Sequence, residues 1–341
     1  MPFTQSASRQ LLMEKYLKCY RHMVRARVLE DKLASLYRAG GRIVGGVYVG
    51  RGQEAFSAAL GGQLTKGHDI YAGIIRDQAG KMAFGEPILD TTRTYLGSVL
   101  GPMRGRDGNI HRGRPKEGMP AMISHLGSMV SVVSGMLMAR RLQGRLGDAV
   151  GATSIGDGGT STGAFHEALN MSAVERLPLI IAIANNQFAY STPNNRQFAC
   201  ASLVDRAKGY GIEGYEVDGT DLQACVEVFQ TAITRARAGH GPQMIVGSLL
   251  RLSGHGEHDD SSYIPEEVRQ SHEGRDCLTV AEQWVRDQHW LSDEEINAVR
   301  EDAQSEVERA IAQTSREQAP DPYKESWRAL ATKSLLDDEQ A

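Results

Sequence analysis

Two short polar segments in the middle of the chain contain residue types that suit a phosphorylated ligand and a divalent cation. The first is Gly156-Asp157-Gly158-Gly159, which follows an apolar run, and the second is Asn185-Asn186, which ends another apolar run. Glycines at a turn let backbone N–H groups approach phosphate oxygens, and the N-terminus of a following helix adds positive potential. A carboxylate and an amide oxygen are ligands that Mg²⁺ accepts beside substrate phosphates. We therefore expect Asp157 and Asn186 to bind one metal ion.

The spacing of the two segments predicts that they lie side by side. The interval from Gly159 to Ala184 is long enough for a crossover helix and a return to an adjacent parallel strand. Both segments would then follow the carboxyl ends of their strands, where open α/β sheets bind ligands. The backbone carbonyl of Phe188, just beyond the second segment, would complete a cage around the cation together with two diphosphate oxygens.

Two other interpretations of these segments are open. The glycines could form a tight strand–helix turn beside an unrelated pair of asparagines. The segment could also belong to a nucleotide site, but Ser161 stands where the GxGxxG pattern has its third glycine. In addition, no Gly-Lys-Ser/Thr sequence follows, so a nucleotide site is the weaker alternative.

The elements that must position these segments alternate between strand and helix patterns. This alternation predicts an α/β fold with a mostly parallel sheet flanked by helices. The expected strands are 149–155, 179–184, 215–217 and 243–250, and the expected helices are 163–173 and 221–237.

Further helical patterns flank this region. Apolar residues at helical spacing predict an amphipathic helix over 11–38, which ends at Gly40-Gly41, and a shorter helix over 53–64. Residues 126–142 are apolar nearly all round, which predicts a buried helix. Residues 100–120 are rich in Gly, Arg and Pro and predict a long functional loop.

The composition excludes several classes of protein. The 341 residues are 41% hydrophobic with a net charge of −4, so no positive field would attract nucleic acid or an anionic membrane. No run approaches the roughly 20 apolar residues of a membrane span, and the N-terminus lacks the apolar core of a signal peptide. The cysteines are scattered without a CxxC pair, which predicts reduced thiols and a cytoplasmic location. They are Cys19, Cys200, Cys225 and Cys277.

Beyond the two central segments, the chain resembles the alpha subunit of the thiamine-diphosphate-dependent decarboxylase component of 2-oxo-acid dehydrogenase complexes. The resemblance runs from about Leu29 to Glu267. It implies a thiamine-diphosphate-binding domain at 45–278, between an N-terminal helical segment at 1–44 and a C-terminal helical extension at 279–341. Besides the central pair, the matching segments are Gly52-Gln53-Glu54-Ala55, Ile75-Arg76-Asp77, Gly108-Asn109-Ile110-His111, Ser124-His125-Leu126-Gly127 and residues 254–262.

The resemblance also implies roles for individual residues. Arg76 would bind the diphosphate, a task that suits a guanidinium because it stays charged and donates in a fork. The backbone of Ser124 and Leu126 would contact the aminopyrimidine ring, and the Leu126 side chain would bend the cofactor. His255 would contact the cofactor and assist acyl transfer, since imidazole exchanges protons near neutral pH. The implied diphosphate and Mg²⁺ site consists of Gly156, Asp157, Gly158, Gly159, Asn186 and the Phe188 carbonyl.

Simpler interpretations of these residues are also open. Arg76 could be a surface arginine. The loop from His255 to Asp260 could be a solvated charged loop, or His255, His258, Asp259 and Asp260 could form a zinc site, although no further ligands cluster nearby.

Several positions depart from the commonest pattern of the family. Tyr48 stands where pyruvate-specific members carry a substrate-side histidine, so we expect it beside the substrate. Gly256 and His258 replace serines that follow the loop histidine in many relatives, which removes phosphorylation at these two positions. The Asp-Asp-Ser-Ser run at 259–262 is similar to that of branched-chain members.

The implied function is oxidative decarboxylation of a 2-oxo acid, with acyl transfer to a lipoyl group. Thiamine enzymes activate the aminopyrimidine with a glutamate from a second, homologous domain, and this chain shows only one such domain. Glu54 is the one tempting candidate, but it lies at the start of a helix. We therefore expect a separate beta subunit, an α2β2 heterotetramer and a lipoyl-bearing acyltransferase partner. An acetoin dehydrogenase alpha subunit and a catalytically silent scaffold are the alternatives.

Overall fold

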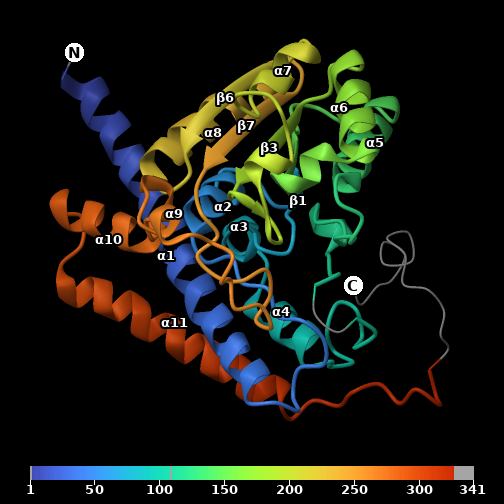
Figure 1. Cartoon of the computed structure of the whole chain (residues 1–341), viewed down its shortest axis with the longest axis vertical. Coiled ribbons are helices and arrows are strands. Elements are labelled where there is room, and N and C mark those ends of the chain that lie inside the picture. Colours follow the sequence, from blue (N-terminus) through green and yellow to red (C-terminus); the bar gives the residue numbers. More distant parts are fainter. Residues whose placement is uncertain (1, 108–109, 326–341) are drawn as a thin grey trace.

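A five-stranded parallel sheet lies at the centre of the computed structural model, with helices on both faces (Figure 1). The structure describes residues 2–107 and 110–325. All pairings between neighbours in this sheet are parallel, which confirms the α/β class expected from the sequence. The strand order is β1 (Ile70–Ala72), β2 (Gly151–Gly156), β3 (Leu179–Asn185), β7 (Gln243–Ser248) and β6 (Glu213–Asp218).

The central strand β3 is apolar throughout because both of its faces are covered. Ile180 and Ala182 belong to one hydrophobic cluster, whereas Ile181 and Ile183 belong to a second cluster on the opposite face. Successive side chains of a strand point to opposite faces, so a strand between two helical layers is a continuous apolar run.

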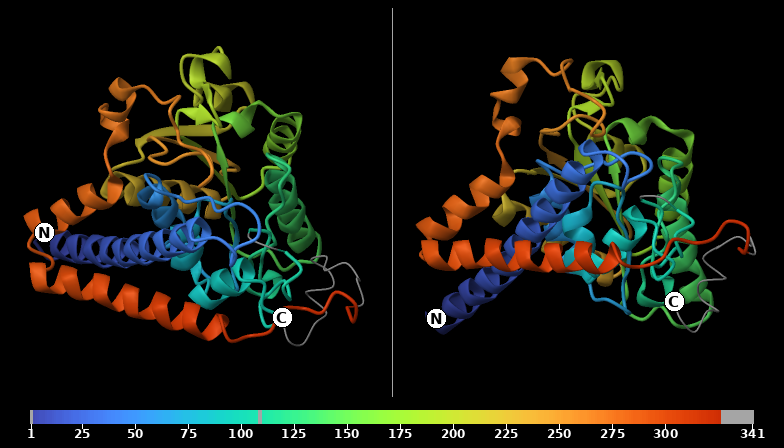
Figure 2. Two further views of the ribbon diagram at one scale, coloured as in Figure 1. Left: turned by 60° about the horizontal axis from the view of Figure 1, so that its bottom comes forward. Right: turned by 90° about the horizontal axis from the view of Figure 1, so that it is seen from below.

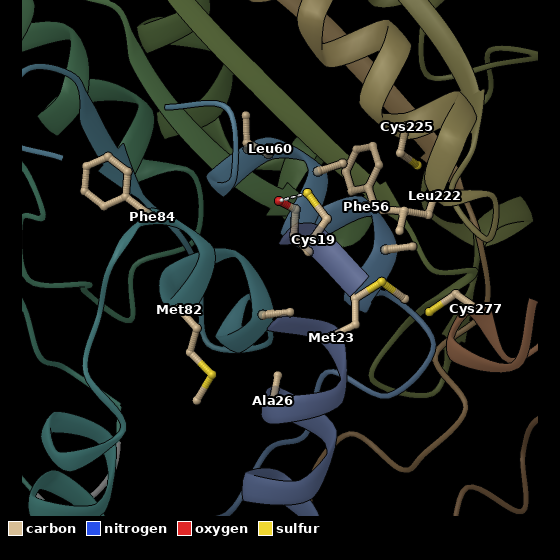
Figure 3. Packing of buried hydrophobic residues seen from close by; sticks show 14 of the residues in the cluster. Cys19, Met23, Ala26, Phe56, Leu60, Met82, Phe84, Leu222, Cys225 and Cys277 are labelled. Carbon is tan, nitrogen blue, oxygen red and sulfur yellow. Dashed lines mark hydrogen bonds between the residues drawn. The ribbon is translucent and has the colours of Figure 1, made fainter. Parts of the chain in front are cut away.

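The larger cluster lies under the helices from both ends of the chain. There α1 packs along α11, as the two views of Figure 2 show. Figure 3 shows this core, in which Cys19 of α1 lies with Phe56 of α2 and Leu222 of α8. The four cysteines are all free. The helices here are α1 (Pro2–Arg38), α2 (Glu54–Gly61), α3 (Gln78–Phe84), α8 (Leu222–Arg237), α10 (Cys277–Asp287) and α11 (Asp293–Thr314), with α4 (Ile88–Tyr95) against α11.

The opposite face of the sheet is covered by α5 (Ser128–Leu142), α6 (Gly163–Val174) and α7 (Asp205–Gly209). The expectation that α5 is buried is only half right. Val133 and Leu137 are buried against the sheet, but Ser131, Gly135 and Ala139 form an exposed face. The residues of this exposed face are small, so the apolar composition concealed which side faces solvent.

The remaining elements are short. The loop expected at 100–120 contains turns and one 3-10 helix, η1 (Pro115–Glu117). Sequence patterns missed β1, α3, α4 and a small hairpin of β4 (Phe188–Ala189) and β5 (Thr192–Pro193). Other short helices are η2 (Gly158–Ser161), η3 (Asn194–Arg196), α9 (Glu266–Arg269) and η4 (His272–Gly274). Across residues 2–107 and 110–325, no helix has the length and apolarity needed to cross a membrane.

Candidate functional site

Three oxygen atoms converge at the carboxyl ends of β2 and β3. These strands are paired through Gly156 and Ala184, so the next residues, Asp157 and Asn186, meet as the spacing predicted. The side-chain oxygen of Asn186 lies 3.1 Å from Asp157 Oδ1 and 3.1 Å from the backbone oxygen of Phe188, and it faces acceptors only. Turned over, the same amide would donate to both oxygens. The turned amide satisfies both oxygens of the chain by itself, whereas with the amide oxygen toward them the three oxygens, one of them anionic, form a donor set that fits Mg²⁺.

Asp157 is held firmly in this cluster. Its side chain is 1% exposed, and its Oδ2 accepts a hydrogen bond of 3.0 Å from Gln197 Nε2. Burial raises the pKa of Asp157, while the Gln197 hydrogen bond and Arg251 act in the opposite direction. A cation bound nearby would stabilise the charged form of this buried carboxylate and would lower its raised pKa.

The glycines of the motif differ in what they are needed for. A Cβ on Gly158 would lie 2.4 Å from Ala189 Cβ, and one on Gly159 would lie 2.6 Å from Ile155 Cγ1. A Cβ on Gly156 would meet no atom of the chain within 4 Å. Packing therefore demands glycine at 158 and 159, whereas Gly156 leaves space at the site.

The predicted α-helix does not follow the motif directly. The 3-10 turn η2 comes first, and α6 begins at Gly163 with Thr162 as its N-cap, whose side chain accepts from Phe165 N–H. The expectation that the N-terminus of a helix adds positive potential directly at the motif is therefore wrong, since the field of a helix end falls off within about one turn. The backbone of the motif remains the part nearest to the oxygen cluster.

Arg76 is a buried cation and not a surface arginine. It follows β1, is 6% exposed, and its Nη2 donates to the His255 carbonyl oxygen at 2.6 Å. Burial and the neighbouring Arg251 lower the pKa of Arg76 to about 10, so the side chain is still charged at neutral pH. Its buried Nη1 has no hydrogen-bond partner within the described part of the chain. A buried guanidinium nitrogen without an acceptor fits an anionic ligand.

His255 lies against Arg76 and is neutral at physiological pH. Its Nδ1 is 3.2 Å from Arg76 Nη2. Partial burial, then Arg76 and Arg251, lower the pKa of His255 to about 4. Its backbone N–H donates to Asp259 Oδ2 at 2.5 Å, so the loop fixes the position of the imidazole.

The zinc interpretation of this loop is wrong. Among the described residues, no group of three or more His, Cys, Asp and Glu side chains could hold a metal ion. Asp259 instead accepts from the backbone of His255 and Ser261 and from the Tyr263 hydroxyl. Burial acts to raise the pKa of Asp259, but these hydrogen bonds outweigh it and lower the pKa to about 2. The carboxylate therefore shapes the loop.

Two tyrosines surround His255. The Tyr48 ring lies edge-on to it at a centroid distance of 5.6 Å, and the Arg76 guanidinium is 5.9 Å from the Tyr48 ring centre. Tyr190, which sequence analysis missed, is closer at 4.6 Å and is half-exposed. His255, Tyr48 and Arg76 thus form one group, although nothing in the sequence indicated that these three side chains touch.

Ser124 and Leu126 lie on the exposed side of the site. Leu126 is 55% exposed, its Cβ would be 3.7 Å from a Cβ on Gly159, and its carbonyl accepts from Thr162 Oγ1 at 3.2 Å. The Ser124 hydroxyl bonds to His111. Gly108 and Asn109, from the motif that ends in His111, lie outside the described residues.

Arg251 and Gln197 are site residues that the sequence did not reveal. Arg251 is 1% exposed, and it donates to the carbonyl oxygens of Tyr190 at 2.9 Å and Phe188 at 3.5 Å. A charged residue shortly after the buried strand β7 was the available signal. Gln197 gave no signal, because the turn after β5 brings it to Asp157.

Glu54 is not available to a cofactor. It is buried, bonds to Arg27 Nε at 2.6 Å, and accepts from Gly52 N–H at 2.8 Å and Cys277 Sγ at 3.1 Å. The contacts with Arg27 and Cys277 tie α2 to α1 and α10, and the contact with Gly52 closes the turn before α2. The carboxylate is therefore part of the fold.

Comparisons with known proteins agree with this arrangement. The model of the family described as "Dehydrogenase E1 component" matches residues 20–323. The alpha subunit of acetoin:2,6-dichlorophenolindophenol oxidoreductase from Cupriavidus necator is 31% identical over 318 residues, which are 93% of this chain and 94% of that protein. The 2-oxoisovalerate dehydrogenase subunit alpha of Bacillus subtilis is 31% identical, covering 85% of this chain and 90% of that protein. The pyruvate dehydrogenase E1 component subunit alpha of Porphyra purpurea is 27% identical, with 91% of each chain covered.

Proposed function

Because the chain belongs to the dehydrogenase E1 component family, we propose that it is the alpha subunit of an enzyme that oxidatively decarboxylates a 2-oxo acid and transfers the acyl group to a lipoyl group. The family and its oxidoreductase class agree with the resemblance found in the sequence. The observation that carries the proposal is the oxygen cluster of Asp157, Asn186 and Phe188. Arg251 interacts electrostatically both with Asp157 of this cluster and with buried Arg76, whose Nη1 has no acceptor among the described residues.

The cofactor that fits this site is thiamine diphosphate with Mg²⁺. Asp157, Asn186 and the Phe188 carbonyl would hold the metal, the backbone at 156–159 and Arg76 Nη1 would bind the diphosphate, and Ser124 and Leu126 would flank the aminopyrimidine. When bound, thiamine diphosphate supplies the carbanion chemistry of the reaction. The chain itself binds and orients the cofactor and supplies the charged groups around it.

His255 and Tyr48 are the proposed residues on the substrate side. In the free site His255 is neutral, so its ring nitrogens can accept or donate a hydrogen bond without carrying charge. We expect His255→Ala to spare cofactor binding and to slow acyl transfer. Tyr48 and Tyr190 would limit the room beside the imidazole.

The site needs a second chain. The glutamate that activates the aminopyrimidine must come from elsewhere, since Glu54 is bound to Arg27 and Cys277. A beta subunit in an α2β2 heterotetramer, working with a lipoyl-bearing acyltransferase in the cytoplasm, completes the proposal. We retain the division into segments 1–44, 45–278 and 279–341 as part of it, although α1 and α11 pack together.

Acetoin cleavage is the second candidate function. Among the relatives, an acetoin oxidoreductase subunit and a 2-oxoisovalerate dehydrogenase subunit are both 31% identical to this chain, and Tyr48 replaces the histidine expected of a pyruvate enzyme. A silent scaffold is less well supported, because a buried guanidinium nitrogen that has no acceptor among the described residues, Arg76 Nη1, would serve no purpose in a scaffold.

The test is an assay of the alpha and beta chains purified together. Oxidation of pyruvate, branched-chain 2-oxo acids and acetoin would be measured with thiamine diphosphate, Mg²⁺ and an artificial electron acceptor. We expect one substrate class to dominate, and the beta chain to be required. Full activity of the alpha chain alone would contradict the heterotetramer, and no heat of thiamine diphosphate binding in a calorimetric titration would favour the scaffold.

A further inference from the structure

A chain of hydrogen bonds links two residues of the loop at 100–120, neither of which has a role in the proposed function, to Ser124. Asp107 Oδ2 lies 2.7 Å from His111 Nδ1, and His111 Nε2 lies 2.5 Å from the Ser124 hydroxyl oxygen. The other carboxylate oxygen of Asp107 accepts from the His111 backbone N–H at 3.3 Å. The loop is thereby closed on itself between residues 107 and 124.

The carboxylate determines which nitrogen of His111 carries the proton. With Asp107 at Nδ1, the neutral imidazole donates from Nδ1 and accepts the Ser124 hydroxyl proton at Nε2. The order Asp–His–Ser also occurs in hydrolases, where the serine attacks a substrate. Here Ser124 is exposed on the open side of the site. Two residues further on, the carbonyl oxygen of Leu126 accepts a hydrogen bond from the Thr162 hydroxyl. These features favour a holding role for the serine.

The loop is also anchored where it begins. Val99 N–H donates to the Gln318 carbonyl at 2.9 Å, and Arg106 Nη2 binds Glu325 Oε2 at 2.5 Å. Arg93 binds Glu317 at 2.7 Å. The segment that follows α11 therefore fixes the loop immediately before Asp107, so Asp107 can orient His111 from a held position.

The other end of the hydrogen-bonded chain reaches the proposed cofactor site. Ser124 is two residues before Leu126, whose carbonyl is bound by Thr162 and whose Cβ lies next to Gly159. Segment 124–126 is thus tied to His111 at one end and to the diphosphate turn at the other. We propose that His111, oriented by Asp107, is a positioning residue that holds segment 124–126 against the aminopyrimidine ring. This inference rests on the proposed function.

The experiment separates the two halves of the cofactor. The alpha–beta complex would be titrated calorimetrically with thiamine diphosphate and, separately, with inorganic pyrophosphate, both with Mg²⁺. We expect His111→Ala, Asp107→Asn and Ser124→Ala to weaken thiamine diphosphate binding by about three- to tenfold, the loss of one hydrogen bond. Pyrophosphate, which lacks the ring, should bind each variant as it binds the natural protein.

The matched control is His68→Ala. His68 Nε2 forms a similar pair with Asp148 at 2.9 Å, on the exposed surface, and its loss should change neither titration. A readout independent of the ligand is the NMR signal of the His111 Nδ1 proton, which should disappear in Asp107→Asn. Thermal unfolding would verify that each variant is folded.

Four results would overturn the inference. Equal weakening of both ligands would mean that the loop has only a general structural role. Unchanged thiamine diphosphate binding in all three variants would remove the role of His111, while the proposed function would stand. Hydrolysis of p-nitrophenyl acetate that is lost in Ser124→Ala but kept in His68→Ala would make Ser124 a nucleophile instead. If the natural complex binds pyrophosphate but no thiamine diphosphate, both the proposed function and this inference fail.

Discussion

At the scale of single residues, the site is a balance of buried charges. Asp157 is the one carboxylate in the oxygen cluster, and Arg251 is a buried cation that interacts electrostatically with it. Arg76 is a second buried cation, next to Arg251, and both arginines donate to backbone carbonyl oxygens. Isolated buried charges are costly unless paired or bound to an ion. A metal ion beside the carboxylate and a diphosphate beside the guanidinium groups would therefore lower the free-energy cost of burying these charges.

Replacing the charge of Asp157 tests this balance directly. Asp157→Asn keeps the shape and leaves an oxygen that can accept from Gln197, but removes the only anionic atom of the cluster. We expect Mg²⁺-dependent binding of thiamine diphosphate to weaken at least about a hundredfold, since charge-assisted contacts are the strong ones. The unfolding temperature should stay the same or rise, because burial raises the pKa of Asp157 and makes its charge costly.

The measurements are calorimetric titration and thermal unfolding of the same samples. Asp302→Asn, on the exposed surface of α11, is the control and should alter neither value. Unchanged metal-dependent affinity in Asp157→Asn would refute the assignment of the metal site.

His255 should take up a proton when an anion binds. Burial, Arg76 and Arg251 lower its pKa to about 4, so it is mostly neutral at pH 5.5. A diphosphate beside Arg76 would add negative charge and raise this pKa toward its ordinary value near 6.5. Between these two values the complex binds more protons than the free protein, so binding should tighten as the pH falls through that window.

Calorimetry in two buffers of different ionisation enthalpy measures the proton uptake. Pyrophosphate binding at pH 5.5 should take up part of a proton in the natural protein and less in His255→Gln. At pH 8 the two proteins should give the same value. Equal uptake by both proteins at pH 5.5 would show that another group titrates.

At the scale of elements, the pairing of neighbouring strands brings residues that are distant in the sequence together at one edge of the sheet. β2 and β3 bring Asp157 and Asn186 together because the two strands are neighbours and parallel. The hairpin of β4 and β5 then returns Phe188 and Ala189 over the glycine turn. Each glycine there has a different task, which two substitutions can separate.

Alanine at Gly158 and at Gly156 should have different effects. In Gly158→Ala the new Cβ would overlap Ala189, so we expect a loss of about 1–3 kcal/mol of stability together with weaker binding. In Gly156→Ala the methyl group meets no atom of the chain, so the unfolding temperature should hold while pyrophosphate binding weakens. Urea unfolding and calorimetric titration measure the two properties. Full pyrophosphate affinity in folded Gly156→Ala would place the anion elsewhere.

The elements also show what sequence patterns can and cannot predict. The buried strands β2 and β3 lie in largely apolar runs, and the polar residues directly after them were found for that reason, whereas Arg251 beyond β7 was missed. β1 has only three residues, too few to show a period, and α3 and α4 have only seven and eight, about two helical turns each. Gln197 and Tyr190 reach the site through loop conformations that tertiary contacts determine. Spacing therefore predicted that Asp157 and Asn186 lie together but missed Gln197, which holds Asp157.

At the scale of the whole molecule, one side of the site is left open. Leu126 is exposed beside the glycine turn, and Glu54 is bound within the fold. α5 begins two residues after Leu126, and its outward face consists of Ser131, Gly135 and Ala139, one helical turn apart. Small side chains let a second helix approach closely. A partner that completes the site from this side would therefore extend over α5.

A large side chain on that face should leave the folding of the alpha chain unchanged but weaken its assembly with the beta chain. A Cβ on Gly135 meets no atom of the chain within 4 Å, so Gly135→Trp should leave the isolated alpha chain folded, with an unchanged unfolding temperature. If the beta subunit covers α5, the indole would block it, and the affinity between the chains should fall at least about tenfold. Gly209 is the matched control, since it is also helical and exposed and its Cβ also meets nothing within 4 Å. Sedimentation velocity of the mixed chains measures the assembly. Normal heterotetramers of Gly135→Trp would exclude this face as the interface.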